Sequence, residues 1–184
     1  MRVLFLRHGE SVHNVHTGEE RLAEELGDVL TERGRAQAAA AGVALRDLGV
    51  TRLLTSPMRR ATETAEAVGE ALGLAPEPIP YSFEHHREET FEEAMGRVHQ
   101  IKRHFEEDPA DGLPLLVSHG ILLRFFLLDS ILGARFTADL VPRMWGLRTY
   151  NCALSTFTHD EPGEPDESLG WSCVTWMARP WDLP

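Results

Sequence analysis

Six short apolar runs punctuate this chain, and most of them are continuous instead of alternating with polar residues. Such runs are typical of strands that are buried on both faces of a sheet. They cover residues 2–6, 52–56, 78–83, 113–118, 152–157 and 171–176. Because helical patterns separate the runs, the sequence predicts a three-layer α/β/α sandwich with a mostly parallel central sheet.

Capping residues mark where two of the helices should begin and end. Thr31 is placed to cap the start of an Ala-rich helix that stops at Gly49. Ser56 as N-cap, Pro57 as first helical residue and Gly73 beyond the end predict a second helix. These residue types are the ones preferred at those positions.

Two further helices differ in the width of their apolar face. Residues 88–108 place one apolar stripe on a surface helix; the stripe comprises Phe91, Ala94 or Met95, Val98, Ile101 and Phe105. Residues 120–133 are apolar nearly all round. That segment should therefore form the most buried helix.

Composition limits the class of protein. The 184 residues show no long linker, so we expect a single domain over residues 1–184. The net charge of −11 argues against a nucleic-acid partner. The longest apolar run contains Arg124 and Asp129 and is too short to span a membrane. Cys152 and Cys173 are too few for a disulfide framework, so we expect a reduced, cytoplasmic protein.

Polar residues follow three of the predicted strands directly. Arg7, His8 and Gly9 follow the first strand, Ser56 to Arg60 the second, and Ser118, His119 and Gly120 the fourth. Ligands of open α/β sheets bind at the carboxyl ends of the strands. Taken alone, each histidine is more typical of a strand-end cap than of a catalyst, but their coincidence with arginines at one edge predicts a site.

The chemistry of this cluster suits a phosphoryl group. Arginine forks match phosphate oxygens, and glycine lets the backbone approach an anion closely. Neither a Gly-rich phosphate loop nor a set of carboxylates at metal-binding spacing is evident. Imidazole is then the available nucleophile, and the nearby arginines should lower the pKa of His8.

Three sequence blocks resemble the histidine phosphatase superfamily, which has the phosphoglycerate-mutase-like fold. The blocks are LRHGES with Asn14, LLTSPMRRATETA and LLVSHGILLR; LTERGRAQA and YNCALSTF extend the likeness to about residue 157. The resemblance implies that His8 becomes phosphorylated. It further implies a metal-independent phosphatase without a cofactor, acting on a small phosphorylated substrate.

The resemblance also assigns the residues around the nucleophile. It implies that Arg7, Arg60 and His119 bind the transferred phosphoryl group, with Ser11, Asn14 and Gly120 beside them; Arg60 and not Arg59 matches the family pattern because it precedes Ala61. Glu84 is the best match for the family's proton donor, with Glu88 and Glu89 as alternatives. The alternatives stay open because residues 83–89 depart from the family pattern.

Hydrolysis is favoured over phosphoryl transfer between positions of a substrate. The resemblance implies that a phosphoglycerate mutase would carry a further sequence block after the third strand and a pair of arginines that binds the substrate carboxylate. Residues 85–110 of this chain contain no such pair. Segments 15–29, 84–90 and 135–149 should set the substrate. In the last segment Trp145 is expected to be packed beside solvated Arg143 and Arg148, with contact to a substrate ring and a second anionic group as the alternative.

Two rival functions are weaker. A metal site would draw on His8, His13, His16, His85 and His86, but their spacings do not place three imidazoles on one face. A non-catalytic phosphate-binding module would not need His8. A phosphoglycerate-mutase-type phosphotransferase remains the alternative within the family.

The C-terminal part leaves two questions open. Residues 159–170 are acidic and without period, which predicts a solvated loop that either closes over the site or does not. Trp171, Trp176 and Trp181 are predicted to be exposed. They would pack on the sheet edge or form the contact of a homodimer.

Overall fold

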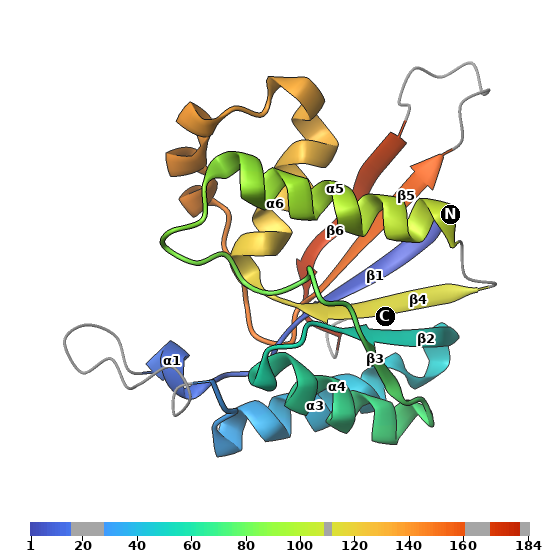
Figure 1. Cartoon of the computed structure of the whole chain (residues 1–184). Helices are drawn as coiled ribbons and strands as arrows, with labels where there is room; N and C mark the ends of the chain where they lie inside the picture. Colours follow the sequence, from blue (N-terminus) through green and yellow to red (C-terminus); the bar gives the residue numbers. More distant parts are fainter. Residues whose placement is uncertain (16–27, 109–111, 161–169, 181–184) are drawn as a thin grey trace.

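A computed structural model describes residues 1–15, 28–108, 112–160 and 170–180. Its centre is a six-stranded sheet with the order β3-β2-β4-β1-β5-β6 (Figure 1). The strands are β1 (Arg2–Arg7), β2 (Val50–Thr55), β3 (Pro76–Pro78), β4 (Leu113–Ser118), β5 (Leu154–Asp160) and β6 (Gly170–Ala178). The first four strands run parallel, and β5 pairs antiparallel with both β1 and β6. The predicted α/β fold with a mostly parallel sheet is confirmed.

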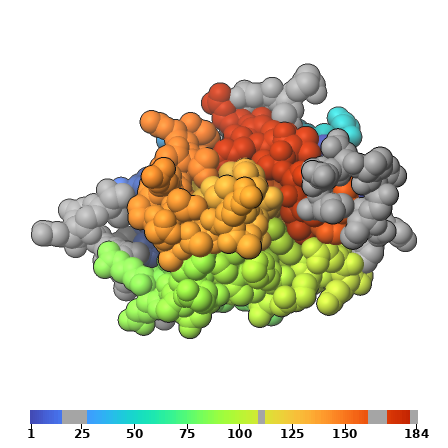
Figure 2. Space-filling view, turned by 90° about the horizontal axis from the view of Figure 1, so that it is seen from above, coloured from blue at the N-terminus to red at the C-terminus, as the bar shows by residue number. Residues whose placement is uncertain are grey.

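Helices cover both faces of the sheet (Figure 1). One face carries α3 (Glu32–Leu45) and α4 (Arg59–Leu72), and the other carries α5 (Phe91–Glu107) and α6 (Gly120–Leu132). Figure 2 looks down on the second face, where α5 borders the segment that runs from α6 toward residue 150. The shorter elements are α1 (Val12–Val15) and the 3₁₀ helices η1 (Arg46–Leu48), η2 (Gly133–Arg135) and η3 (Ala138–Gly146).

Alternate residues of β1 feed two separate hydrophobic clusters. Val3 and Phe5 pack with residues of α5 and α6, whereas Leu4 and Leu6 pack with residues of α3 and α4. Successive side chains of a strand point to opposite faces, so a strand buried on both sides must be apolar throughout. This explains the continuous apolar runs in the sequence.

The helix starts agree with the capping signals in one case and differ in another. Thr31 caps α3 by accepting a hydrogen bond from the backbone N–H of Gly34. Helix α4, however, begins at Arg59 with Met58 as N-cap, two residues later than Ser56 and Pro57 predict. The Ser56 hydroxyl lies 2.7 Å from Nε2 of His119 and also accepts the backbone N–H of Met58 at 3.3 Å.

Prolines shorten the third strand. The sequence predicts a strand over residues 78–83, but β3 covers only Pro76–Pro78, and Ser82 N–H bonds back to the carbonyl of Ile79 in a turn. Proline has no N–H to donate to a ladder, so it confines strands to sheet edges. The chain is thus free to turn toward Glu84.

The aromatic residues near the C-terminus differ from expectation. Trp171 is buried in the core, where its Nε1–H donates to Glu106, so the prediction that it is exposed is wrong. Trp181 lies outside the described residues, as do residues 161–169 of the 159–170 segment. The described ends of that segment belong to β5, which ends at Asp160, and to β6, which begins at Gly170. Within the described residues, none of the helices has the length and apolar content needed to cross a bilayer.

Candidate active site

The two histidines of the site follow neighbouring strands. Arg7 of β1 is paired with Ser118 of β4, so His8 and His119 emerge one residue later at the same edge of the sheet. Their ring centroids are 5.2 Å apart, and both side chains are buried. Sheet register therefore brings together the two histidines that the sequence predicts as partners.

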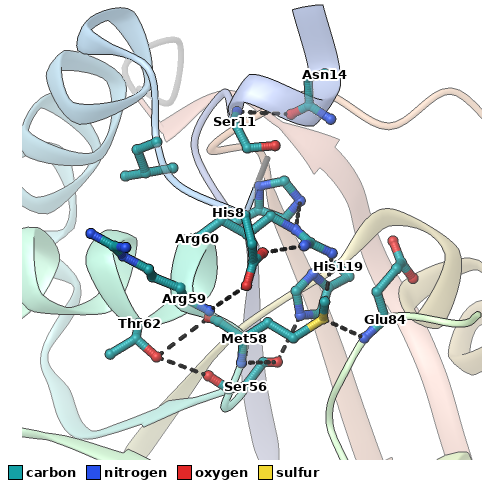
Figure 3. A network of polar contacts seen from close by, with 12 residues as sticks. His8, Ser11, Asn14, Ser56, Met58, Arg59, Arg60, Thr62, Glu84 and His119 are labelled. Atoms are coloured by element: carbon teal, nitrogen blue, oxygen red, sulfur yellow. Dashed lines mark hydrogen bonds and ion pairs between the residues drawn. The ribbon is translucent and has the colours of Figure 1, made fainter. Parts of the chain in front are cut away.

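Hydrogen bonds select the tautomer of His8. Its Nδ1 lies 2.7 Å from the carbonyl oxygen of Gly9, which can only accept, so Nδ1 carries the proton. Its Nε2 accepts a hydrogen bond from Nε of Arg60 at 3.2 Å (Figure 3). The unprotonated Nε2 of His8 thus faces the guanidinium of Arg60. Because a guanidinium attracts anions, an anionic substrate bound there would lie next to Nε2.

The surroundings hold both imidazoles neutral. Burial is the largest cause that lowers the pKa of His8 well below its ordinary value, and the charges of Arg60 and Arg7 lower it further. The pKa of His119 is lowered well below its ordinary value mainly by burial, with Arg60, His8 and Arg7 adding to the effect. The direction expected from the arginines is confirmed for His8, although desolvation contributes more.

Arg60 is held on all sides. Besides His8, it contacts Asp28 through Nη1 and the sulfur of Met58 through Nη2 at 3.4 Å. Asp28 also accepts the backbone N–H of Arg59 at 2.9 Å. The guanidinium therefore faces Nε2 of His8 in a fixed orientation.

Arg7 is anchored to the segment that follows η3. Its Nη1 donates to the carbonyl of Thr149 at 3.0 Å, while its Nε is buried without a hydrogen-bond partner among the described residues. A Cβ at Gly120 would lie 3.2 Å from this Nε and 2.8 Å from the Thr149 hydroxyl. Glycine at the first position of α6 thus leaves room for the arginine.

Three successive carbonyls fix that segment. Leu147 accepts from Nε of Arg124 at 2.8 Å, Arg148 from the indole N–H of Trp176 at 3.2 Å, and Thr149 from Arg7. These three hydrogen bonds hold residues 147–149 in place beside Arg7.

Buried polar atoms without partners gather at this site. Among the described residues they are Arg7 Nε, Ser11 Oγ, His119 Nδ1 and, away from the site, His104 Nε2. Buried polar groups are nearly always paired, so three orphans around His8 point to a polar ligand. Asn14 lies beside them, because its side-chain oxygen accepts from the N–H of Ser11 at 3.1 Å and from Asn151 at 3.0 Å.

Of the three acidic candidates, the structure brings only Glu84 to this edge. Its carboxylate accepts the backbone N–H groups of Ile121 and Leu122 at 3.2 and 3.1 Å, in the first turn of α6. Glu88 is exposed, and Glu89 is buried against Arg97. The negative charge of Glu84 also raises the pKa of Arg7, against the larger effect of burial. Glu89 accepts a hydrogen bond from Arg97 and so helps to hold the loop that carries Glu84.

A thiol lies behind the nucleophile but is unreactive. The backbone N–H of Cys152 donates to the carbonyl of Arg7 at 3.0 Å, from a left-handed conformation with φ of 52°. Burial raises the pKa of the Cys152 thiol to about 12. At neutral pH it is therefore a poor nucleophile beside His8.

Close backbone contact holds the turn after β1. A Cβ at Gly34 would lie 1.9 Å from the carbonyl oxygen of Glu10, and Thr31 N–H donates to the same oxygen at 2.9 Å. The start of α3 thus presses directly on the turn that carries His8.

Asp28 and Met58 escaped the sequence analysis. Nothing in their spacing shows that they reach Arg60, since Asp28 is 32 residues away and a methionine in a helix cap has no polar signature. The histidines weighed as metal ligands do not converge: within the described parts of the chain, no three or more His, Cys, Asp or Glu side chains are grouped to hold a metal ion. His16 lies outside those parts.

The chain resembles known proteins in sequence. Residues 3–81 match the model of the histidine phosphatase superfamily (branch 1), which confirms the resemblance drawn from the motifs. A probable phosphoglycerate mutase GpmB of Erwinia tasmaniensis is 28% identical over 208 residues, covering 95% of this chain and 92% of that protein.

Solved structures share the fold. A mycobacterial glucosyl-3-phosphoglycerate phosphatase superposes with a TM-score of 0.70 at 21% identity, covering 96% of this chain and 99% of that one. A phosphoserine phosphatase mutant of Entamoeba histolytica gives 0.74 at 14% identity, covering 99% of each chain.

Proposed function

We propose that this chain, whose residues 3–81 match the histidine phosphatase superfamily, hydrolyses phosphate monoesters through a phosphohistidine on Nε2 of His8. The observation that carries the proposal is the hydrogen-bond pattern of His8. Its Nδ1 proton is bound by the Gly9 carbonyl, and its bare Nε2 faces Arg60. Two solved structures with this fold are named as phosphatases, which supports hydrolysis as the reaction.

The phosphoryl group would bind where the orphan donors converge. We assign Arg7, Arg60 and His119 to its oxygens, with Ser11, Asn14 and the N–H of Gly120 completing the pocket. Fixed donors aimed at the equatorial oxygens commonly contribute about 3 kcal/mol each to a transition state. The pocket supplies its positive charge locally, within a chain of net charge −11.

The reaction divides into two displacements at phosphorus. In the first, the lone pair of His8 Nε2 forms a bond to phosphorus, the ester P–O bond breaks, and Glu84 gives a proton to the leaving oxygen. In the second, Glu84 takes a proton from water, whose oxygen attacks phosphorus and releases His8. A positioned proton donor typically contributes roughly 10²–10⁴-fold. No metal or organic cofactor takes part in this scheme.

Phosphoryl transfer within phosphoglycerate is the second candidate, because curated relatives carry that name. The loop after β3 favours hydrolysis. Arg97 of α5 binds Glu89 and the Phe83 carbonyl of this loop, and His85 also binds Glu89. The loop presents no arginine pair toward the site.

The first experiment measures phosphate release from 4-nitrophenyl phosphate in EDTA by wild type and by His8→Ala. This leaving group needs little help from an acid, so the result does not depend on Glu84. We expect turnover in the wild type and none in the variant, and turnover that survives the substitution would overturn the mechanism. A parallel assay with 3-phosphoglycerate separates the candidates, since a mutase isomerises it faster than it releases phosphate.

A further inference from the structure

Trp145 is a large aromatic side chain that is exposed on the 3₁₀ helix η3. The sequence favours a packed tryptophan, yet 58% of its surface is exposed, so that expectation is wrong. Its neighbour Met144 is buried, and Leu140 and Val141 of the same 3₁₀ helix pack on the core. The exposure of the indole thus comes from an anchored helix that holds it outward.

The indole is backed by a buried cation. The guanidinium carbon of Arg124 lies 4.9 Å from the centre of the Trp145 ring. Arg124 is itself nine-tenths buried, and its Nε is bound to the carbonyl of Leu147. A cation over one face of the ring fixes its orientation and leaves the rest of the ring available.

The backing arginine connects the indole to the phosphate pocket. Arg124 lies one helical turn beyond Gly120 on α6, on the face that abuts Arg7, because residues four apart share a helix face. Arg124 interacts electrostatically with Arg7 and with Glu84. Trp145 is thus placed, through Arg124, beside the same helix α6 whose Ile121 and Leu122 hold the carboxylate of Glu84.

We propose that Trp145 is a stacking platform for a planar aromatic or heteroaromatic ring in the leaving group, which makes ring-bearing phosphomonoesters the preferred substrates. This inference rests on the proposed function. An indole held on one face by Arg124 costs little entropy to order, and stacking of a ring on an aromatic side chain accepts any planar π-system. Arg124 positions the platform.

The test compares esters whose leaving groups are all primary alcohols. Phenylalkyl phosphates with one, two or three methylenes between oxygen and ring are compared with the cyclohexylalkyl phosphates of equal length. Adenosine 5′-monophosphate supplies a heteroaromatic ring, and propyl phosphate supplies none. Because the chemical step is alike throughout, differences in kcat/KM report on the ring.

Wild type should prefer at least one phenylalkyl ester over its cyclohexyl counterpart by about tenfold, the effect of one stacked ring. Trp145→Ala should abolish the preference, Trp145→Phe should keep most of it, and Trp145→Leu should lose it. Val43→Ala, which changes an exposed apolar residue on α3, serves as the matched control and should leave the ratio intact. A higher kcat/KM for adenosine 5′-monophosphate than for the phenylalkyl phosphates would identify the preferred ring as heteroaromatic.

Two outcomes overturn the inference separately from the proposed function. Equal kcat/KM for phenyl and cyclohexyl esters at all three lengths, or a preference that survives Trp145→Ala, overturns the platform while His8-dependent turnover of propyl phosphate stands. A wild type that hydrolyses 4-nitrophenyl phosphate but none of these esters overturns the platform alone, whereas a wild type that hydrolyses neither overturns the proposed function and the platform with it.

Discussion

Arg59 and Arg60 are adjacent in the chain but point to opposite sides of the first turn of α4 (Figure 3). Arg60 is buried against His8, whereas 65% of the Arg59 side chain is exposed and its Nε binds Glu63 at 2.8 Å. The helix thus places Arg60 in the site and Arg59 on its own exposed surface.

This pair provides a matched test of the phosphate pocket. Arg60→Ala should lower kcat/KM for 4-nitrophenyl phosphate by roughly 10²–10³, because it removes a fixed donor from the transition state. Arg59→Ala should change kcat/KM less than twofold, since a surface ion pair contributes little. Comparable losses in the two variants would show that the guanidinium near His8 has no special role.

Glu84→Gln should affect substrates according to their leaving group. An alkyl phosphate should lose roughly 10²–10⁴ in kcat, since an alkoxide leaves poorly without a proton, while 4-nitrophenyl phosphate should lose much less. Glu88→Gln is the control, because its side chain is exposed. Equal losses on both substrates would assign Glu84 to binding or to the start of α6 instead.

The buried histidines should make the free energy of unfolding depend on pH. The pKa values of His8 and His119 are lowered in the folded protein, whereas an unfolded histidine titrates near pH 6.5. Below that pH the unfolded chain therefore binds protons that the folded one does not. Keeping the two histidines neutral therefore costs nothing well above pH 6.5, and the free energy of unfolding falls by up to about 1.4 kcal/mol per histidine for each pH unit below it.

Urea denaturation at pH 7.5, 6.5 and 5.5 measures this dependence. His119→Gln should show a shallower fall between pH 6.5 and 5.5 than wild type, because one proton fewer is taken up on unfolding. Carboxylates titrate alike in both proteins and cancel in the comparison. Parallel curves would contradict the neutral state of His119.

Two glycines in helices should respond oppositely to alanine. Gly34→Ala places a Cβ against the carbonyl of Glu10 and should destabilise the protein by roughly 1–3 kcal/mol, as overpacking does. Gly96→Ala, within α5, meets no atom within 4 Å and should stabilise by roughly 0.5–1 kcal/mol. Both changes in the free energy of unfolding are measured from the midpoints of urea denaturation. A Gly34→Ala variant as stable and as active as wild type would contradict the close contact between Gly34 and the Glu10 carbonyl.

Features encoded within a few residues were predictable from the sequence. The apolar runs predicted a sheet covered by helices on both faces. Thr31 predicted the start of α3, because its side chain caps the helix through a hydrogen bond to a residue only three positions later. The meeting of His8 with His119 followed from the rule that parallel strands end at one edge. Arg60 was separated from Arg59 by family pattern, and its contact with His8 agrees.

Features that depend on tertiary contacts were not predictable. Asp28 reaches Arg60 across 32 residues, and the Ser56 hydroxyl meets His119 across 63 residues while it also accepts the backbone N–H of Met58. One face of the Trp145 ring is covered by Arg124, which is 21 residues earlier in the chain. Nothing local distinguishes an indole held outward from one packed inward.

The pairing of Arg7 with Ser118 has a consequence for how this scaffold can be altered. Because a backbone ladder sets the spacing of the two imidazoles, that spacing is independent of the connections at the same edge. Residues 138–146 can then be varied without moving the nucleophile, because Glu84 and the Thr149 carbonyl that anchors Arg7 lie outside them. A library confined to η3 should redirect substrate choice while the phosphate-handling core is inherited intact.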